Sequence, residues 1–332
     1  MQPTLRTVVT TSVLMLVLPF IGWAQADTAQ ASTTIAAARK AYKSGQFAEA
    51  LELSEQGVAG FKRATKSTTD SATYAKLVDA LTLRAFMLRK NNRAQESANS
   101  YPEICDTIMS RWDETHPELT WIWFRRAQRY YLLNKWDSGV YALQRATHLI
   151  GEFHPDQQGL LASCINFLGV LHMEKGDFEA AHQHYLKAHN MKREMFGEIS
   201  EQVAKSHFNF GLLCQDTDRD QKALNHFLKA LELHTQLGNK RNVVAASIQV
   251  NVANGYFAVG EYGKALDHID QALEIQQDFY EPDDYSVLLA INLMAQCMRH
   301  SETTERPLFN GNGNFPCATK RWWQRTRALQ LP

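Results

Sequence analysis

Apolar and polar positions along this 332-residue chain repeat at a fixed step of 42 positions. Each repeat has a turn residue, and the turns fall at Asn92, Asn134, Gly176, Asp218 and Gly260. Small residues stand seven positions before each turn, at Ala85, Ala127, Gly169, Gly211 and Ala253, and five positions after it, at Ser97, Gly139, Ala181, Ala223 and Ala265. A large side chain follows four positions later, at Tyr101, Leu143, Tyr185, Phe227 and Ile269.

This spacing predicts a unit of two helices joined at the turn residue. Small residues let the helices approach closely, and the large side chains fill the gap between neighbouring turns. A unit of this kind cannot bury its own apolar face, so it must stack on its neighbours. The predicted fold class is therefore an all-α helical solenoid.

The residues at these positions resemble the tetratricopeptide repeat. Its consensus is matched by Leu168-Gly169, Gly176-Asp177-Phe178, Ala181, Tyr185 and Ala188. The family's usual period is about 34 residues; the longer step here, with His154-Pro155-Asp156 leading into a helix, is more similar to the kinesin-light-chain variety. Asn and Asp replace the turn glycine in three units, and they are the next-best residues for a left-handed turn position.

The resemblance covers about residues 33–300 and implies a right-handed superhelical solenoid of antiparallel helix pairs. We expect about six pairs plus an unfinished helix, with the first turn at Gly45. In such arrays the first helix of each pair lines the concave face. The resemblance is specific for the fold and says little about function.

Residues 1–26 have the pattern of a signal peptide. Arg6 precedes a short apolar core around Val13–Leu18, and Ala24-Gln25-Ala26 is a small-x-small cleavage pattern. We expect cleavage near Ala26, a linker over residues 27–32, and an exported chain that is periplasmic or secreted. An uncleaved N-terminal anchor is the alternative. No later stretch is apolar enough to insert in a membrane.

Charge and cysteine content narrow the class of protein further. The chain has 35 basic and 35 acidic residues, so it has no general attraction for nucleic acid or anionic membranes. Four of its five cysteines occupy helix positions, which favours apolar core residues over a disulfide framework. These are Cys105, Cys164, Cys214 and Cys297, whereas Cys317 lies in the tail.

If the resemblance holds, groove-facing positions recur on one stripe of each first helix. The candidate partner-binding residues on this stripe are Trp121, Phe124, Gln128, Tyr131, Asn166, Phe208, Gln215, Asn254 and Phe257. Aromatic side chains with a few amides suit an extended peptide or a helix laid in the groove. Some family members clamp a terminal carboxylate with Lys, Asn and Arg, but Lys205 and Arg125 are scattered and do not complete that set. The alternative is that several of these aromatics pack between helices.

Three histidines, His184, His226 and His268, share one position in successive units. A metal site is one interpretation, but equivalent points on neighbouring helices lie roughly 8–10 Å apart, too far for shared zinc ligands at about 2 Å from the metal. A structural row is favoured. No nucleophile elbow, phosphate loop, zinc-protease motif or dinucleotide fingerprint is found. We expect no catalytic residue and no cofactor.

The periodicity stops after about residue 300. The next turn falls due at residue 302, but Pro307, Asn310-Gly311-Asn312-Gly313 and Pro316 follow instead. The basic and aromatic tail over residues 301–332 is interpreted as an anionic-surface or nucleic-acid contact, a disordered end, or the result of a shifted reading frame in a longer gene. Exported bacterial proteins with such arrays often continue into a caspase-like peptidase domain.

Together these observations predict an exported scaffold that binds a protein or peptide partner in its concave groove without catalysis. Two alternatives remain open. In the first alternative the chain is the sensor half of a larger effector. In the second it is a metal- or small-molecule-binding enzyme that uses the histidine row.

Overall fold

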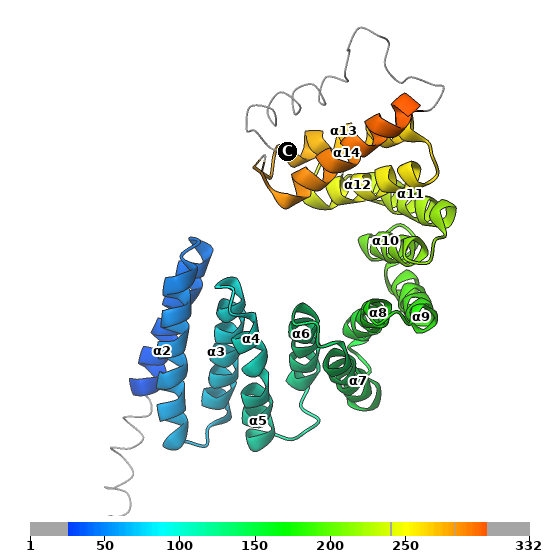
Figure 1. Ribbon diagram of the computed structural model, residues 1–332. Coiled ribbons are helices and arrows are strands. Elements are labelled where there is room, and N and C mark those ends of the chain that lie inside the picture. The colour runs from blue at the N-terminus through cyan, green and yellow to red at the C-terminus, as the bar shows by residue number, and fades with distance from the viewer. Residues whose placement is uncertain (1–25, 240, 282, 304–332) are drawn as a thin grey trace, which may run out of the picture. The chain divides into compact units, whose positions relative to one another are not determined.

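The computed structural model describes residues 26–239, 241–281 and 283–303 of the chain (Figure 1). Within these ranges the chain is all-α, and no strand is present. The residues divide into two compact units, one ending at Cys164 and the other beginning at Ile165. The expected signal peptide lies almost wholly outside the described residues, and the tail beyond residue 303, with Cys317, lies outside them entirely.

The first unit contains three helix pairs. Residues 26–43 are helical, and the helices that follow are α2 (Phe47–Lys66), α3 (Ser71–Lys90), α4 (Ala94–Asn99), α5 (Tyr101–Arg111), α6 (Glu118–Leu132) and α7 (Trp136–Phe153). In the second and third pairs the first helix packs on the second, α2 packs on α3, and α4 and α5 pack on α6. Phe61, Leu81, Tyr101, Ile104 and Leu119 are among the side chains of its main core.

The second helix of the second pair is broken into α4 and α5 at Ser100. Pro102 stands one position into α5, where its lack of an N–H removes a helical hydrogen bond and its ring crowds the preceding turn. The Ser100 N–H instead donates to the carbonyl of Ser97 at 3.2 Å, a tighter turn than the α-helix. The sequence period continues through this break.

The second unit continues the same arrangement to the end of the described chain. Its helices are α8 (Gln158–Glu174), in which the boundary between the units falls, α9 (Phe178–Phe196), α10 (Glu201–Gln215), α11 (Asp220–Gln236), α12 (Val243–Ala258), α13 (Tyr262–Gln276) and α14 (Tyr285–Thr303). These make three pairs and a single further helix, α14, which packs on α13. The position where a second helix would follow α14 lies outside the described residues.

The turn residues have the left-handed conformation that the sequence predicts. Asn92, Asn134 and Asp218 have φ of 59°, 55° and 54°, and Gly176 and Gly260 have 77° and 81°. This region is unfavourable for most L-residues, and Asn and Asp tolerate it better than others. The turns therefore explain why Gly, Asn and Asp alternate at this one position of the repeat.

The small and large positions meet across each pair, as the spacing predicts. A Cβ on Gly169 of α8 would lie 2.5 Å from Cδ1 of Tyr185 on α9, and a Cβ on Gly211 of α10 would lie 2.4 Å from Cε1 of Phe227 on α11. Both ring side chains are fully buried. The absence of a side chain on the first helix is what admits the large ring of the second.

Residues 27–32, which the sequence predicts to be a linker, are instead helical and belong to the first helix of the first pair. Ala31 is buried, and a Cβ on Gly60 of α2 would lie 2.8 Å from the Ala31 Cβ. Gly57 faces Ile35 in the same way. Two glycines on α2 thus let the N-terminal part of the first helix pack closely against α2.

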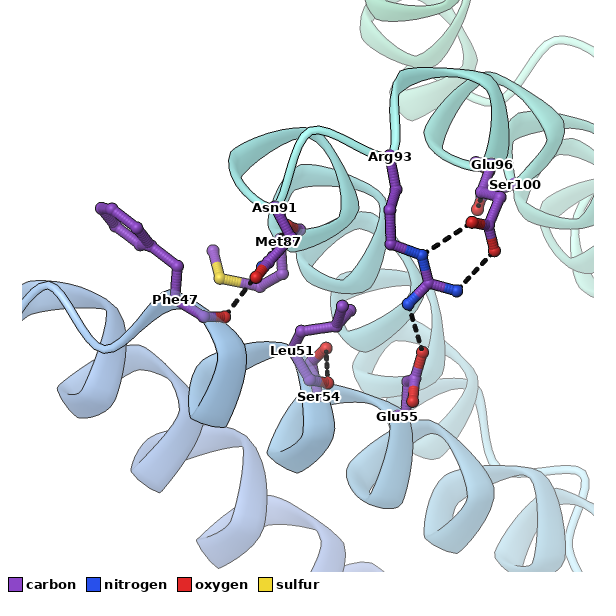
Figure 2. A network of polar contacts seen from close by, with 9 residues as sticks. All are labelled: Phe47, Leu51, Ser54, Glu55, Met87, Asn91, Arg93, Glu96 and Ser100. Carbon is purple, nitrogen blue, oxygen red and sulfur yellow. Dashed lines mark hydrogen bonds and ion pairs between the residues drawn. The ribbon is translucent and has the colours of Figure 1, made fainter.

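A polar network joins the first pair to the turn of the second (Figure 2). The Asn91 side chain donates to the carbonyls of Phe47 at 2.8 Å and Met87 at 2.9 Å. Arg93, two residues on, contacts Glu96 at 2.5 Å and Glu55 on α2 at 4.0 Å. Side chains beside the turn therefore help to hold neighbouring repeats in register.

Candidate functional site

The first helices of the first unit form a surface with two adjoining hollows. The larger, about 370 Å³, lies between α3 and α6 and is lined by Val78, Asp79, Thr82, Glu118, Trp121, Ile122 and Arg125. We call it the Trp121 hollow. A neighbouring hollow of about 320 Å³ is lined by residues of the first helix, α2 and α3, including Ile35, Arg39, Phe61 and Lys76. Asp79 lines both, and it forms an exposed ion pair with Arg39 at 2.6 Å.

Trp121 is the most exposed of the aromatic residues that the sequence places in the groove. It is 50% exposed on α6, and its ring lies edge-on to Phe124 with centroids 5.9 Å apart. Phe124, Gln128 and Tyr131 continue the stripe along α6 and are half-buried. An indole held at the rim of a hollow that also has Val78 and Ile122 in its wall can cover an apolar side chain of a partner.

The aromatic candidates of the second unit pack within the protein. The Phe208 ring is half-buried, lies 5.6 Å from that of Phe227 and packs against a core cluster. Phe257 packs on Tyr262 at 5.5 Å and on His300 at 5.3 Å. Gln215 and Asn254 are half-buried. The candidate residues thus fall on two compact units. Trp121, in the first unit, is exposed enough to contact a partner.

Asn166 is held in a polar network rather than presented alone. Its side-chain oxygen accepts from Lys192 Nζ on α9 at 3.0 Å and from Asn209 Nδ2 on α10 at 3.0 Å. Lys192 is only 8% exposed, and no carboxylate pairs with it among the described residues. Burial lowers the pKa of the Lys192 ammonium to about 8, and the neighbouring charge of Lys205 adds to the effect.

Lys192 occupies a repeat position that is apolar in the first unit. The equivalent residues, 42 positions apart, are Ile108, Ile150, Lys192, His234 and Gln276, and all are buried. His234 contacts the Asn242 side chain at 3.3 Å and lines a polar hollow of about 310 Å³ on α11, α12 and α13. Sequence reasoning missed this series, although the step of 42 reveals it once the position is known to be buried.

The three histidines of the predicted row each pack on the first helix of their own pair. His184 stacks on His172 at 5.2 Å, and His268 stacks on Tyr256 at 5.3 Å. His226 stacks on Phe210 at 5.4 Å, and its Nδ1 lies 3.2 Å from Nδ1 of His207. The contacts run within pairs, not along the row. No cluster of metal-ligating side chains is found in the part of the chain that the structure describes.

The described cysteines form no disulfide. Cys105, Cys164 and Cys297 are buried and Cys214 is half-buried, all as free thiols. Burial raises the pKa of Cys105 and Cys297 to about 11 and that of Cys164 to about 12. These thiols are therefore protonated core side chains, as the sequence predicts.

Comparison with known proteins identifies the repeats. The family model of the tetratricopeptide repeat matches residues 161–236 and 244–305. No curated protein matches the chain in a sequence comparison. Across the described ranges, every helix is too short or too polar to cross a membrane.

Solved structures share the fold at low sequence identity. BtubC (BKLC) from P. vanneervenii is 21% identical, covering 79% of this chain and 94% of that chain, with a TM-score of 0.56. The putative kinesin light chain TPR-like repeats of Podosopora anserina are 15% identical over 64% of this chain and 97% of that one, with a TM-score of 0.53.

A STAND protein (signal transduction ATPase with numerous domains) with a tetratricopeptide repeat sensor, from Pyrococcus horikoshii, is 12% identical. The match covers 90% of this chain and 42% of that chain, with a TM-score of 0.63. A fold of this kind suggests a protein–protein interaction scaffold. Residues 161–236 and 244–305 are tetratricopeptide repeats, and the chain has the all-α fold of kinesin-light-chain-like repeat proteins.

Proposed function

We propose that the chain is a protein–protein interaction scaffold that holds a peptide or helix of a partner on the first-helix face, without catalysis. The observation that carries this proposal is Trp121, which is half exposed at the rim of a hollow between two first helices. Exposed indole rings beside apolar pockets are over-represented among residues that dominate binding energy. The adjoining hollow extends the surface by one more helix pair.

The size of the surface favours an extended segment or a single helix over a small molecule. The two hollows share Asp79 and are open to solvent, and charged side chains are among the residues that line them. A small ligand needs a concave site that buries most of its surface. A peptide instead can place successive side chains in successive hollows, because they lie side by side along the helix array.

Selection from a library of random short peptides displayed on phage tests the proposal. The wild-type chain is expected to enrich binding sequences, and Trp121→Ala is expected to lose them. Tyr141→Ala is the matched control, because Tyr141 is 57% exposed on α7, a second helix of the same unit. Circular dichroism must show equal folding of the three proteins. If Trp121→Ala selects the same peptides as the wild type, the first-helix face is not the site.

We also propose that the chain is exported after cleavage near Ala26, on the strength of the apolar core and small-x-small pattern within residues 1–26. Fractionation of the producing cells and sequencing of the mature N-terminus test this. A mature chain that begins at Asp27 in the exported fraction is expected. An intact chain that begins at Met1 in the cytosol would contradict it.

A second candidate is a sensor within a larger signalling protein. The observation that favours it is the match to the P. horikoshii STAND protein, which has a tetratricopeptide repeat sensor. Reading the gene beyond codon 300 in all frames tests it. Coding for further repeats or for an effector domain in another frame would support a sensor, and its absence would favour the free scaffold.

A further inference from the structure

The side of α14 that faces the place of a second helix is only partly covered. Ala295 stands at the small position of the repeat, and it is half-buried. Its counterparts on the five preceding first helices are all buried, and they are Ala85, Ala127, Gly169, Gly211 and Ala253. Leu288 is also half-buried, whereas its buried counterparts are Val78, Thr120, Ala162, Ala204 and Ala246. The end of a repeat array leaves such positions open unless another segment covers them.

The open positions continue to the start of α14 with larger apolar side chains. Tyr285 is 74% exposed and Leu289 is 45% exposed. Residues three, four and seven positions apart share one face of a helix. Tyr285, Leu288, Leu289 and Ala295 therefore form one apolar stripe, which we call the α14 stripe. A contiguous exposed apolar surface marks a place where another segment binds.

The α14 stripe has negative charge at one end and positive charge at the other. The loop that leads into α14 carries four carboxylates and no Lys or Arg, namely Asp278, Glu281, Asp283 and Asp284. Asp278 pairs with Arg241 at 2.7 Å, and in the described part of the chain no ion pair involves the other three. Arg299 and His300 stand near the opposite end of the helix. A basic segment is therefore attracted to the N-terminal end of α14.

The C-terminal segment of the chain, residues 304–332, has the complementary side chains. Its basic run over residues 320–327 contains Lys320, Arg321, Arg325 and Arg327, without an acidic residue, around Trp322 and Trp323. Residues 304–319 link this run to the end of α14, and these 16 residues span up to roughly 50 Å when extended. The 19-residue helix α14 is about 28 Å long. The link is long enough for the basic run to reach the acidic loop.

We propose that residues 304–332 cover the α14 stripe, with the two tryptophans against Tyr285 and Leu289 and the basic run beside the loop carboxylates. A tethered segment has an effective concentration on the order of millimolar, so it outcompetes a second copy of the chain for the same stripe. The contact belongs to the second unit and does not depend on the Trp121 hollow of the proposed function. It closes the end of the array with a segment that lacks the repeat pattern.

Photo-crosslinking within the full chain tests this contact from both sides. A photo-crosslinking amino acid replaces Gln324, beside the tryptophans, in one protein and the exposed Asn292 of α14 in another. We expect crosslinks within the monomer that join position 324 to residues 278–295 and position 292 to residues 304–332, identified by mass spectrometry after digestion. Crosslinks between two chains would place a second copy on the stripe. That result, crosslinks to other parts of the chain, or no crosslink from either position would overturn the proposal.

Charge reversal in the loop distinguishes a specific contact from the mere proximity of a tethered segment. Glu281→Lys combined with Asp283→Lys should lower the yield of crosslinks from position 324 at least about fivefold, because attraction becomes repulsion. Glu179→Lys combined with Glu194→Lys is the matched control, since both carboxylates are exposed on α9 of the same unit, and it should keep the wild-type yield. Circular dichroism must show equal folding of the proteins. Equal yields from the loop variant and the control would contradict the ionic contact.

Discussion

The ring of Tyr185 occupies the space beside Gly169, where a Cβ would lie 2.5 Å from Cδ1 of the ring. Gly169→Ala is therefore expected to destabilise the second unit by about 1–3 kcal/mol, because a fully buried ring cannot move away without disturbing its neighbours. Chemical denaturation measures the change in unfolding free energy.

Gly151→Ala is the control for this prediction. Gly151 is also helical, on α7, but a Cβ there would meet nothing within 4 Å. It should stabilise the chain by about 0.5–1 kcal/mol through the lower entropy of the unfolded state. Equal effects of the two substitutions would show that close packing on Gly169 does not hold the pair together.

Lys192→Met is expected to stabilise the protein. Lys192 is a buried ammonium held by amide and hydroxyl oxygens, at a position where the first unit has Ile108 and Ile150. Removing a buried charge without a counter-ion avoids its desolvation cost, worth about 3 kcal/mol for a pKa shift from 10.5 to about 8. Exposed Lys187→Met, on the same helix, should change stability by less than about 0.5 kcal/mol.

The pH dependence of stability distinguishes the desolvation of the Lys192 ammonium from a simple packing effect of the substitution. Between pH 8 and 10.5 the unfolded chain keeps a proton on Lys192 that the folded chain has released, so wild-type stability should rise with pH across that window. Lys192→Met should lack this part of the rise. Parallel wild-type and variant curves would contradict the assignment.

We expect the protein to lose stability in acid because the pKa of His207 is lowered. Burial first, and then the neighbouring His226 and His189, lower its pKa to about 4. Between pH 6.5 and 4 the unfolded chain binds a proton that the folded chain does not, so stability falls as the pH falls, by about 2 kcal/mol once solvent screening is allowed for. His207→Phe should flatten the curve, whereas exposed His148→Phe leaves the His207–His226 contact intact and should keep the wild-type slope.

Substitutions at Asn134 test whether the turn requires a residue that tolerates a positive φ. Its φ of 55° is one that a β-branched residue adopts only at considerable cost. Asn134→Val is expected to destabilise the first unit by about 1–2 kcal/mol, and Asn134→Gly should be neutral or slightly stabilising. Thermal unfolding of the two variants measures this. A tolerated valine would mean that the turn changes its conformation.

Much of the fold can be predicted from the sequence because each repeat position has one local physical requirement. Asn134 and Gly176 meet the same requirement for a left-handed turn, and Gly169 meets the requirement for close packing. The break at Ser100 could not be predicted from the period, because it depends on Pro102 within one helix. The helical start before residue 33 packs on Gly57 and Gly60 of α2, and of these two only Gly57 stands at a repeat position, the one that Ala146 occupies two repeats later.

The candidate site is less predictable, because exposure depends on how helices pack. Trp121 and Phe208 look alike as aromatic positions on first helices, yet Trp121 borders a hollow, whereas Phe208 packs on Phe227.

Photo-crosslinking from position 118 tests the central claim most directly, because Glu118 is exposed, lines the same hollow and leaves Trp121 in place. A photo-crosslinking amino acid would replace Glu118 in one protein and Tyr141 in another, each mixed with a peptide selected by the wild-type chain. Crosslinks from position 118 and none from position 141 are the predicted result, since the two residues lie on a first and a second helix of the same unit. Crosslinks from position 141 alone would place the partner on the second-helix side and contradict the account.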